Sequence, residues 1–205
     1  VTDSRQGHLS TMVAMTAPPT TSTRQLLADV GLALFAEHGY DHVTTEQIAA
    51  AAGVTQRTLF RHFATKLDLL FADADETTDE FVELLYRQPP GPVTVALINA
   101  IEQQDRTSVF DERSKMVARI VGDTPSLWEA RRGYEAHFES LLAEWIGQRH
   151  ALDADDFGVR VLAAMLVAAR RVVVDQWRRA PDGSSVVDLA RRALAPIDVG
   201  WLPTR

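Results

Sequence analysis

The sequence predicts an all-α protein of about nine helices, and two observations carry this prediction. Apolar residues recur every three or four positions along most of the chain from residue 23 onward, which is the period of a helix with one buried face. Capping residues, glycines and prolines divide this pattern into segments of helical length, and no strand-like alternation survives the helical interpretation. Residues 1–22 are rich in Thr, Ser, Pro and Ala and lack the period, so we expect a disordered amino-terminal tail.

The first helix is expected over residues 23–38, with Gly39 at its end. Two short helices joined by a tight turn follow. Thr44 can cap the first of them, with Gln47 completing a capping box, and Gly53 can end it in a left-handed conformation that is inexpensive only for glycine. Thr55 then caps the second short helix.

This spacing is typical of a helix-turn-helix that reads DNA. Ala49 is small where the two helices come closest, and Val54 and Leu59 point back into their junction. Gln56 and Arg57 then lie in the first turn of the second helix, the part that meets base edges in a major groove, and both can make bidentate contacts there. A helical hairpin with solvated polar residues is the alternative interpretation.

The segment also resembles the TetR family of bacterial transcriptional regulators. Three phrases carry the resemblance: FAEHGY at residues 35–40, TTEQIAAAAGV at 44–54 and TLFRHFATK at 58–66. It covers residues 23 to 70 closely and the remainder only in layout and size. The family pattern has a phosphate-binding tyrosine where this chain has Phe60, so the hydroxyl contact is absent and only the ring can pack on the DNA backbone.

The motif and the resemblance together imply a set of DNA-contacting residues, in which His62 and Lys66 contact phosphate. At His62 and Lys66, an ordinary surface histidine and a first-turn lysine are the alternatives. The expected set is Thr44, Thr45, Thr55, Gln56, Arg57, Thr58, Phe60, Arg61, His62 and Lys66.

We expect a fourth helix to run without a hinge from Thr65 to Arg87, ending at the QPPGP of residues 88–92. It would join a DNA-binding domain at 23–69 to a helical body at 70–205. Five further helices are expected in the body, around residues 93–101, 116–121, 125–145, 155–179 and 185–194.

The last two of these helices carry broad apolar surfaces, and the resemblance implies that they form a four-helix bundle across a homodimer axis. Packing within one protomer is the alternative. The resemblance also implies a cavity for a small-molecule effector among the four body helices before the last one. Its candidate residues, for which plain core packing is the alternative, are Gln103, Met116, Trp128, Tyr134, His137 and Phe138.

Composition restricts the other function classes. The chain of 205 residues has no cysteine, and its six histidines form no metal-ligand pattern, so we expect no metal, no cofactor and no catalytic residue. No apolar run approaches a membrane span and no signal-peptide core is present, so we expect a cytoplasmic protein that does not enter a membrane.

The net charge of −7 is unevenly distributed. Residues 1–66 hold five basic and five acidic side chains, whereas residues 67–205 hold 16 and 23. A neutral amino-terminal part argues against coating DNA nonspecifically, because phosphate neutralisation supplies most nonspecific affinity, but it allows site-specific binding. We therefore expect a ligand-responsive repressor that binds a palindromic operator in double-stranded DNA. The competing class is a non-catalytic helical interaction protein that keeps the helix-turn-helix as scaffold, and a helical enzyme ranks last.

Overall fold

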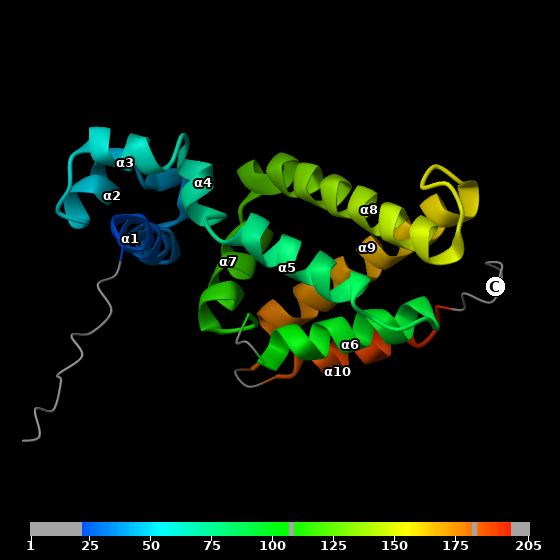
Figure 1. Cartoon of the computed structure of the whole chain (residues 1–205). Coiled ribbons are helices and arrows are strands. Elements are labelled where there is room, and N and C mark those ends of the chain that lie inside the picture. The colour runs from blue at the N-terminus through cyan, green and yellow to red at the C-terminus, as the bar shows by residue number, and fades with distance from the viewer. Residues whose placement is uncertain (1–21, 107–108, 182–183, 198–205) are drawn as a thin grey trace, which may run out of the picture.

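The computed structural model describes residues 22–106, 109–181 and 184–197, so the expected tail lies outside the described residues apart from Ser22. All regular structure within these ranges is helical, which confirms the all-α prediction. The elements are α1 (Thr23–His38), η1 (Tyr40–His42), α2 (Thr45–Ala51), α3 (Gln56–His62), α4 (Lys66–Leu70), α5 (Ala74–Tyr86), α6 (Val93–Arg106), α7 (Glu112–Asp123), η2 (Pro125–Leu127), α8 (Trp128–His150), α9 (Phe157–Arg179) and α10 (Val186–Leu194). Figure 1 shows α1 to α4 gathered at one end and α5 to α10 forming a larger body beside them.

The helix ends of the amino-terminal part follow the capping residues of the sequence. Thr44 Oγ1 accepts a hydrogen bond from Gln47 N at 3.2 Å, and Gln47 Oε1 accepts one from Thr44 N at 2.8 Å, which completes the expected capping box. Thr55 Oγ1 accepts from Thr58 N in the same way at 3.2 Å. Gly53 has φ +69°, so the left-handed turn after α2 is also as predicted.

The expected uninterrupted helix from Thr65 to Arg87 is wrong. α4 ends at Leu70, Phe71 to Asp73 are non-helical, and α5 begins at Ala74. The break arises because the two halves of the apolar stripe are buried in different places: Leu70 belongs to the amino-terminal core, whereas Leu85 belongs to the core of the body.

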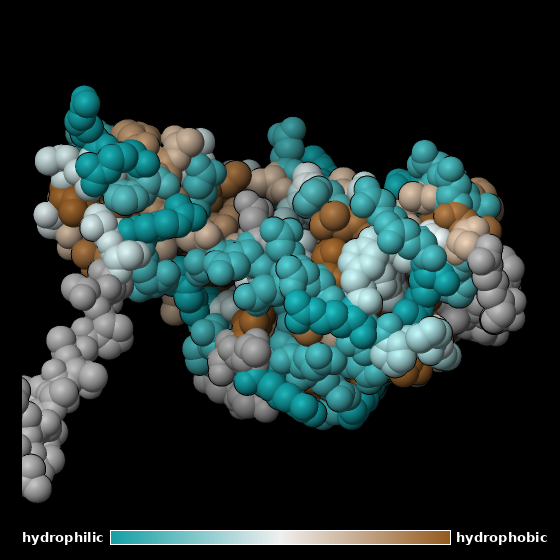
Figure 2. Space-filling model, viewed as in Figure 1, coloured by the Kyte–Doolittle hydropathy of each residue, from teal (hydrophilic) through white to brown (hydrophobic). Residues whose placement is uncertain are grey.

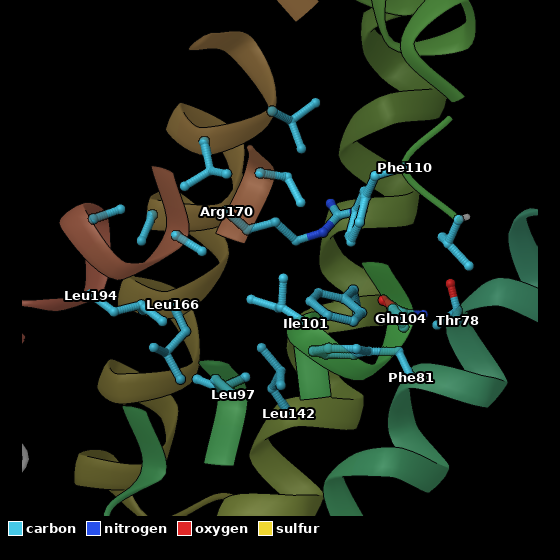
Figure 3. Close-up of a pocket in the computed structure, with 18 of the residues that line it drawn as sticks. Thr78, Phe81, Leu97, Ile101, Gln104, Phe110, Leu142, Leu166, Arg170 and Leu194 are labelled. Carbon is cyan, nitrogen blue, oxygen red and sulfur yellow. The ribbon is translucent and has the colours of Figure 1, made fainter. Parts of the chain in front are cut away.

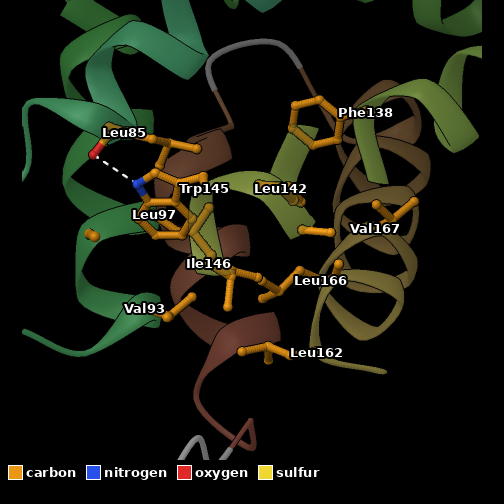
Figure 4. Close-up of a cluster of buried hydrophobic side chains, with 14 of the residues drawn as sticks. Leu85, Val93, Leu97, Phe138, Leu142, Trp145, Ile146, Leu162, Leu166 and Val167 are labelled. Atoms are coloured by element: carbon orange, nitrogen blue, oxygen red, sulfur yellow. Dashed lines mark hydrogen bonds between the residues drawn. The ribbon is translucent and has the colours of Figure 1, made fainter. Parts of the chain in front are cut away.

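The core of the body lies between α5, α6, α8 and α9 (Figure 4). Trp145 of α8 is almost fully buried there, and its indole Nε1 donates a hydrogen bond to the carbonyl of Leu85 at 3.1 Å. This bond satisfies the one polar atom of the side chain, as burial of a tryptophan requires. Pro125, expected in the first turn of the long helix, instead begins the short helix η2 that precedes α8.

Helix α7 packs against the amino-terminal part as well as the body. Ile120 and the neighbouring Leu127 join the same buried cluster as the side chains of α1 and α4. Arg113 of α7 forms ion pairs with Asp29 of α1 at 2.6 Å and with Asp73 in the α4–α5 break at 3.2 Å. The amino-terminal core therefore extends beyond residue 69, where the sequence places the domain boundary.

A buried arginine joins α7 to α9. The guanidinium of Arg178 is almost fully buried and pairs with Asp123 at 2.6 Å and with Asp175 at 3.0 Å. It packs closely against Gly122, where a Cβ atom would come within 2.5 Å of Arg178 Cζ. Glycine at this position is therefore what allows the guanidinium to sit between the two helices.

Hydrophilic side chains cover most of the face shown in Figure 2. Large apolar side chains are nevertheless exposed on α9, among them Phe157, Met165 and Val172. Within the described residues no helix is long and apolar enough to cross a membrane.

Candidate DNA-binding surface and ligand cavity

The junction of α2 and α3 is built by the small and apolar residues that the sequence indicates. Ala49, Leu59 and Ile48 are buried, and Val54 N donates to Ala49 O at 2.9 Å across the turn. The second helix is thereby held at a fixed angle to the first, with its remaining residues facing outward. This arrangement is that of a helix-turn-helix.

The outward surface of α3 carries the side chains expected to contact DNA. Arg57 and Arg61 are exposed, and Phe60 has 49% of its surface accessible. Gln56 is half-buried, because its Nε2 donates to Thr45 Oγ1 of α2 at 3.0 Å. The Gln56 side chain is thus pre-oriented from the neighbouring helix, whereas the two arginines have room to reorient.

The threonines expected to contact DNA lie near the amino-terminal ends of α2 and α3. Thr44 and Thr55 are exposed at their capping positions, and Thr45 and Thr58 are half-buried. Thr55 Oγ1 and Thr58 Oγ1 are 3.0 Å apart and share a hydrogen bond. All four therefore lie at the amino-terminal ends of α2 and α3, where backbone N–H groups favour anions.

Lys66 makes contacts that the sequence does not reveal. Its Nζ donates to the carbonyls of Tyr40 at 2.8 Å and Val43 at 3.0 Å, and it lies 4.1 Å from the centroid of the Tyr40 ring. Burial lowers the pKa of the Lys66 ammonium, and the nearby carboxylate of Asp41 only partly opposes this effect. Lys66 thus ties η1 to the start of α4, and it retains one further N–H for a phosphate.

Arg24 is a supporting residue whose role no sequence motif indicates. It donates to the carbonyls of His62 and Ala72, both at 3.0 Å, and its guanidinium lies over the Phe63 ring. These contacts hold the end of α3 and the α4–α5 break against α1. The expected contact residue His62 is half-buried beside this link, with Arg61 Nη2 3.5 Å from its Nε2.

The body contains a cavity of about 150 Å³. Side chains of α5, α6, α8, α9 and α10 line it, and Phe81, Phe110, Leu142 and Leu166 form part of its mainly apolar wall (Figure 3). Its polar lining consists of Thr77, Thr78, Gln104, Tyr134 and Arg170. A pocket with this lining suits a small, mostly apolar molecule with a few polar groups.

Two of the six candidate ligand residues, Tyr134 and Phe138, line this cavity. The structure places the other four outside it. Gln103 is exposed and bonds within its own helix, Met116 packs against the amino-terminal core, and Trp128 and His137 are exposed. The neighbouring Gln104 faces inward instead, and an apolar stripe read from sequence does not fix such a one-residue difference in helical phase.

A more open cleft of about 380 Å³ adjoins the cavity. Tyr134 and Arg170 line both spaces. The cleft reaches Phe71 and Asp73 in the α4–α5 break, and Arg113 of α7. The interior of the body is therefore continuous with the region where body and amino-terminal part meet.

Comparison with known proteins agrees with this architecture. The family profile described as bacterial regulatory proteins of the tetR family matches residues 27–72. The profile of the MftR C-terminal domain matches residues 87–201, which is more than half of the chain. The chain belongs to the TetR family. It is accordingly a DNA-binding transcriptional regulator.

Two curated relatives show the extent of the likeness. The HTH-type transcriptional regulator TcmR of Streptomyces glaucescens is 32% identical over 76% of this chain and 73% of its own length. The putative mycofactocin biosynthesis transcriptional regulator MftR of Mycobacterium tuberculosis is 26% identical over 77% of this chain and 81% of its own length. The interaction-protein alternative, in which the helix-turn-helix is only a scaffold, is not retained.

Solved structures share the fold. NalD, the secondary repressor of the MexAB-OprM multidrug efflux pump in Pseudomonas aeruginosa, superposes with a TM-score of 0.63 at 22% identity, covering 85% of this chain and 94% of NalD. SmeT in its complex with triclosan gives 0.63 at 21% identity, covering 89% and 98%. SmeT is the repressor of the Stenotrophomonas maltophilia pump SmeDEF. At these identities the likeness concerns the fold alone.

Among the described residues, no three or more His, Cys, Asp or Glu side chains lie together in a group that could hold a metal ion.

Proposed function

We propose that this TetR-family regulator is a cytoplasmic repressor that binds a palindromic operator as a homodimer and is released by a small molecule. The observation that carries the proposal is the outward surface of α3, with Arg57, Phe60 and Arg61 exposed on a helix that α2 holds from behind. In this geometry α3 can enter a major groove while Thr44 and Thr55 approach phosphates at helix amino termini.

Dimerisation through α9 and α10 would place two reading helices one helical turn of DNA apart, or a multiple of it. Five side chains on one face of α9 are half-buried or exposed in the single chain and support its role in the interface: Val161, the adjacent pair Ala164 and Met165, Ala168 and Val172. The two alanines would allow a partner helix to approach closely. We expect more than roughly 2,000 Å² of buried surface in total, as in obligate dimers.

The contribution of α10 would be polar. Its apolar side chains, such as Ala190 and Leu194, are buried against its own protomer, and its outer face carries Asp188, Arg191 and Arg192. We therefore propose that α9 supplies the apolar centre of the interface and α10 its charged rim.

Effector release requires a route from the cavity to α3, and Tyr134 supports one. Its hydroxyl bonds to Thr78 Oγ1 at 2.7 Å, and Thr78 in turn donates to the carbonyl of Ala74, the first residue of α5. Its ring stacks on Phe71 in the α4–α5 break, with centroids 6.4 Å apart. A molecule that displaces Tyr134 would move the joint through which α4 and α3 are positioned.

The α4–α5 break changes the expected mechanism. An effector would act by bending the joint at Phe71 to Asp73 rather than by rotating one rigid helix. A ligand can shift operator affinity only by preferring one arrangement of such a joint. Typical coupling would change operator affinity about 5- to 150-fold.

Selection of bound fragments from random or genomic DNA by the purified protein tests the proposal. We expect a palindrome. Arg57→Ala should relax base preference at one position of each half-site. Recovery of no enriched sequence, or unchanged preference in Arg57→Ala, would exclude site-specific reading by α3.

A further inference from the structure

The cavity wall contains one charged side chain among the described residues, Arg170 of α9. Figure 3 shows this side chain reaching from α9 into the cavity. No carboxylate lines the cavity with it, although the body as a whole is acidic. The electrostatic character of the cavity is therefore set by a single cation.

Arg170 differs from other arginines of the body in its contacts. Arg113, Arg131 and Arg178 each pair with two carboxylates, and Arg160 pairs with Glu139. Arg170 has no carboxylate within 4.0 Å in the described part of the chain, and its guanidinium instead lies 4.9 Å from the centroid of the Phe138 ring and 5.3 Å from that of Tyr134. Its planar set of N–H donors is thus still available for a carboxylate.

We propose that the effector is an organic anion with an apolar, preferably aromatic, body and one carboxylate, and that Arg170 binds the carboxylate. This inference rests on the proposed function, in that it treats the cavity as the effector site. Phe81, Phe110 and Phe138 offer aromatic surface to the body of the molecule. The carboxylate would lie where cavity and cleft meet, because Arg170 lines both.

The position of Arg170 also connects binding to the α4–α5 break. Its guanidinium covers the ring of Tyr134, which bonds to Thr78 and stacks on Phe71. A carboxylate that draws the guanidinium toward itself weakens the cation–π contact and frees the Tyr134 ring. A neutral molecule of the same shape fills the cavity without this effect, so it is a weaker inducer.

The test compares three probes of one shape with the DNA-free protein at 150 mM salt: 4-phenylbutyrate, 4-phenylbutan-1-ol and 4-phenylbutylamine. Isothermal titration calorimetry should show the carboxylate binding about tenfold or more tighter than the alcohol, as expected for charge-assisted hydrogen bonds, and the amine binding most weakly. Equal affinities of carboxylate and alcohol, or no binding of any of the three, would overturn the proposal.

Two arginine variants assign the effect to Arg170. Arg170→Gln should lose the preference for carboxylate while keeping the affinity for the alcohol within about twofold. Arg171→Gln is the matched control, because Arg171 is the next residue on α9, is exposed, and lines the cleft but not the cavity. An equal loss in both variants would indicate a general electrostatic field and would refute a contact with Arg170.

Operator binding is measured separately, so the two failures are distinguishable. Loss of DNA selection would remove the proposed function and leave the calorimetric preference standing. A protein that selects an operator but does not prefer the carboxylate keeps its proposed function and loses this inference. If Arg170→Gln does not fold, Arg170→Lys takes its place, because lysine keeps the charge but not the planar fork of donors. The three-probe comparison on the wild type and on Arg170→Lys then decides whether Arg170 binds the carboxylate.

Discussion

Replacement of Lys66 by alanine should destabilise the amino-terminal part more than the loss of one surface charge would. The Lys66 ammonium donates to the carbonyls of Tyr40 and Val43 and lies over the Tyr40 ring. Hydrogen bonds from a charged donor contribute about 1.5–3 kcal/mol each, and a cation–π contact adds about 0.5–1 kcal/mol at an exposed site. Because Lys66 is only partly buried and water can replace it at the carbonyls, we expect a loss of about 2–4 kcal/mol.

Urea unfolding followed by circular dichroism measures this loss. With a slope of about 2 kcal/mol per molar urea, the midpoint should fall by about 1–2 M at unchanged slope. Arg61→Ala is the control, because Arg61 is exposed on the neighbouring helix and its replacement removes the same charge. The free energy of unfolding of this variant should stay within about 0.5 kcal/mol of wild type. Equal midpoints for the two variants would refute the bracing role of Lys66.

The same variant separates bracing from phosphate contact on DNA. If the remaining N–H of Lys66 also binds phosphate, Lys66→Ala should lower the salt slope of operator binding by about one unit, measured where both proteins are fully folded. A weaker affinity at unchanged slope would leave Lys66 with the structural role alone.

Three further predictions concern other parts of the molecule. Phe60→Tyr should tighten operator binding about 3- to 10-fold by adding a hydroxyl donor to an exposed ring, and unchanged affinity in a titration would show that this ring does not approach phosphate. Met165→Glu should give a monomer in sedimentation at micromolar concentration with unchanged helicity, because Met165 is exposed on α9, and a variant that still sediments as a dimer would place the interface elsewhere. Burial by itself raises the pKa of Asp175, but the hydrogen bond from Arg178 and the charges of Arg131, Arg178 and Arg179 outweigh it, so the pKa is lowered from its usual value. The stability that Asp175 contributes is therefore present above about pH 4 and lost below it. Asp175→Asn should be less stable than wild type by about 1–2 kcal/mol at pH 7, and a gap that stays constant down to pH 2 would contradict the assignment.

The dimer test differs from one chosen on sequence alone. Leu166 belongs to the apolar pattern of α9 but is buried and lines the cavity, and Leu189 is half-buried against its own protomer. A charge at Leu166 would disrupt folding of the protomer and leave the interface untested. Period alone cannot decide which of two adjacent apolar residues, Met165 or Leu166, faces a partner.

The sequence by itself determined what depends on residues close together along the chain. The caps at Thr44 and Thr55, the left-handed Gly53 and the small Ala49 act within a few residues of their partners, so their spacing was sufficient to predict the helix-turn-helix. Most helices of the body were predicted for the same reason, because each carries a stripe at helical period.

Tertiary structure alone decided what depends on contacts distant in sequence. The break between α4 and α5 exists because the two halves of one apolar stripe are buried in two different cores. The stripe itself does not indicate that there are two cores. Arg170 and Arg178 are identical side chains two turns apart on α9, yet Arg178 meets Asp123 of α7 whereas Arg170 meets two aromatic rings of α8. Burial, charge pairing and availability for a ligand are set by the helices packed against a residue, and that packing is a property of the whole fold.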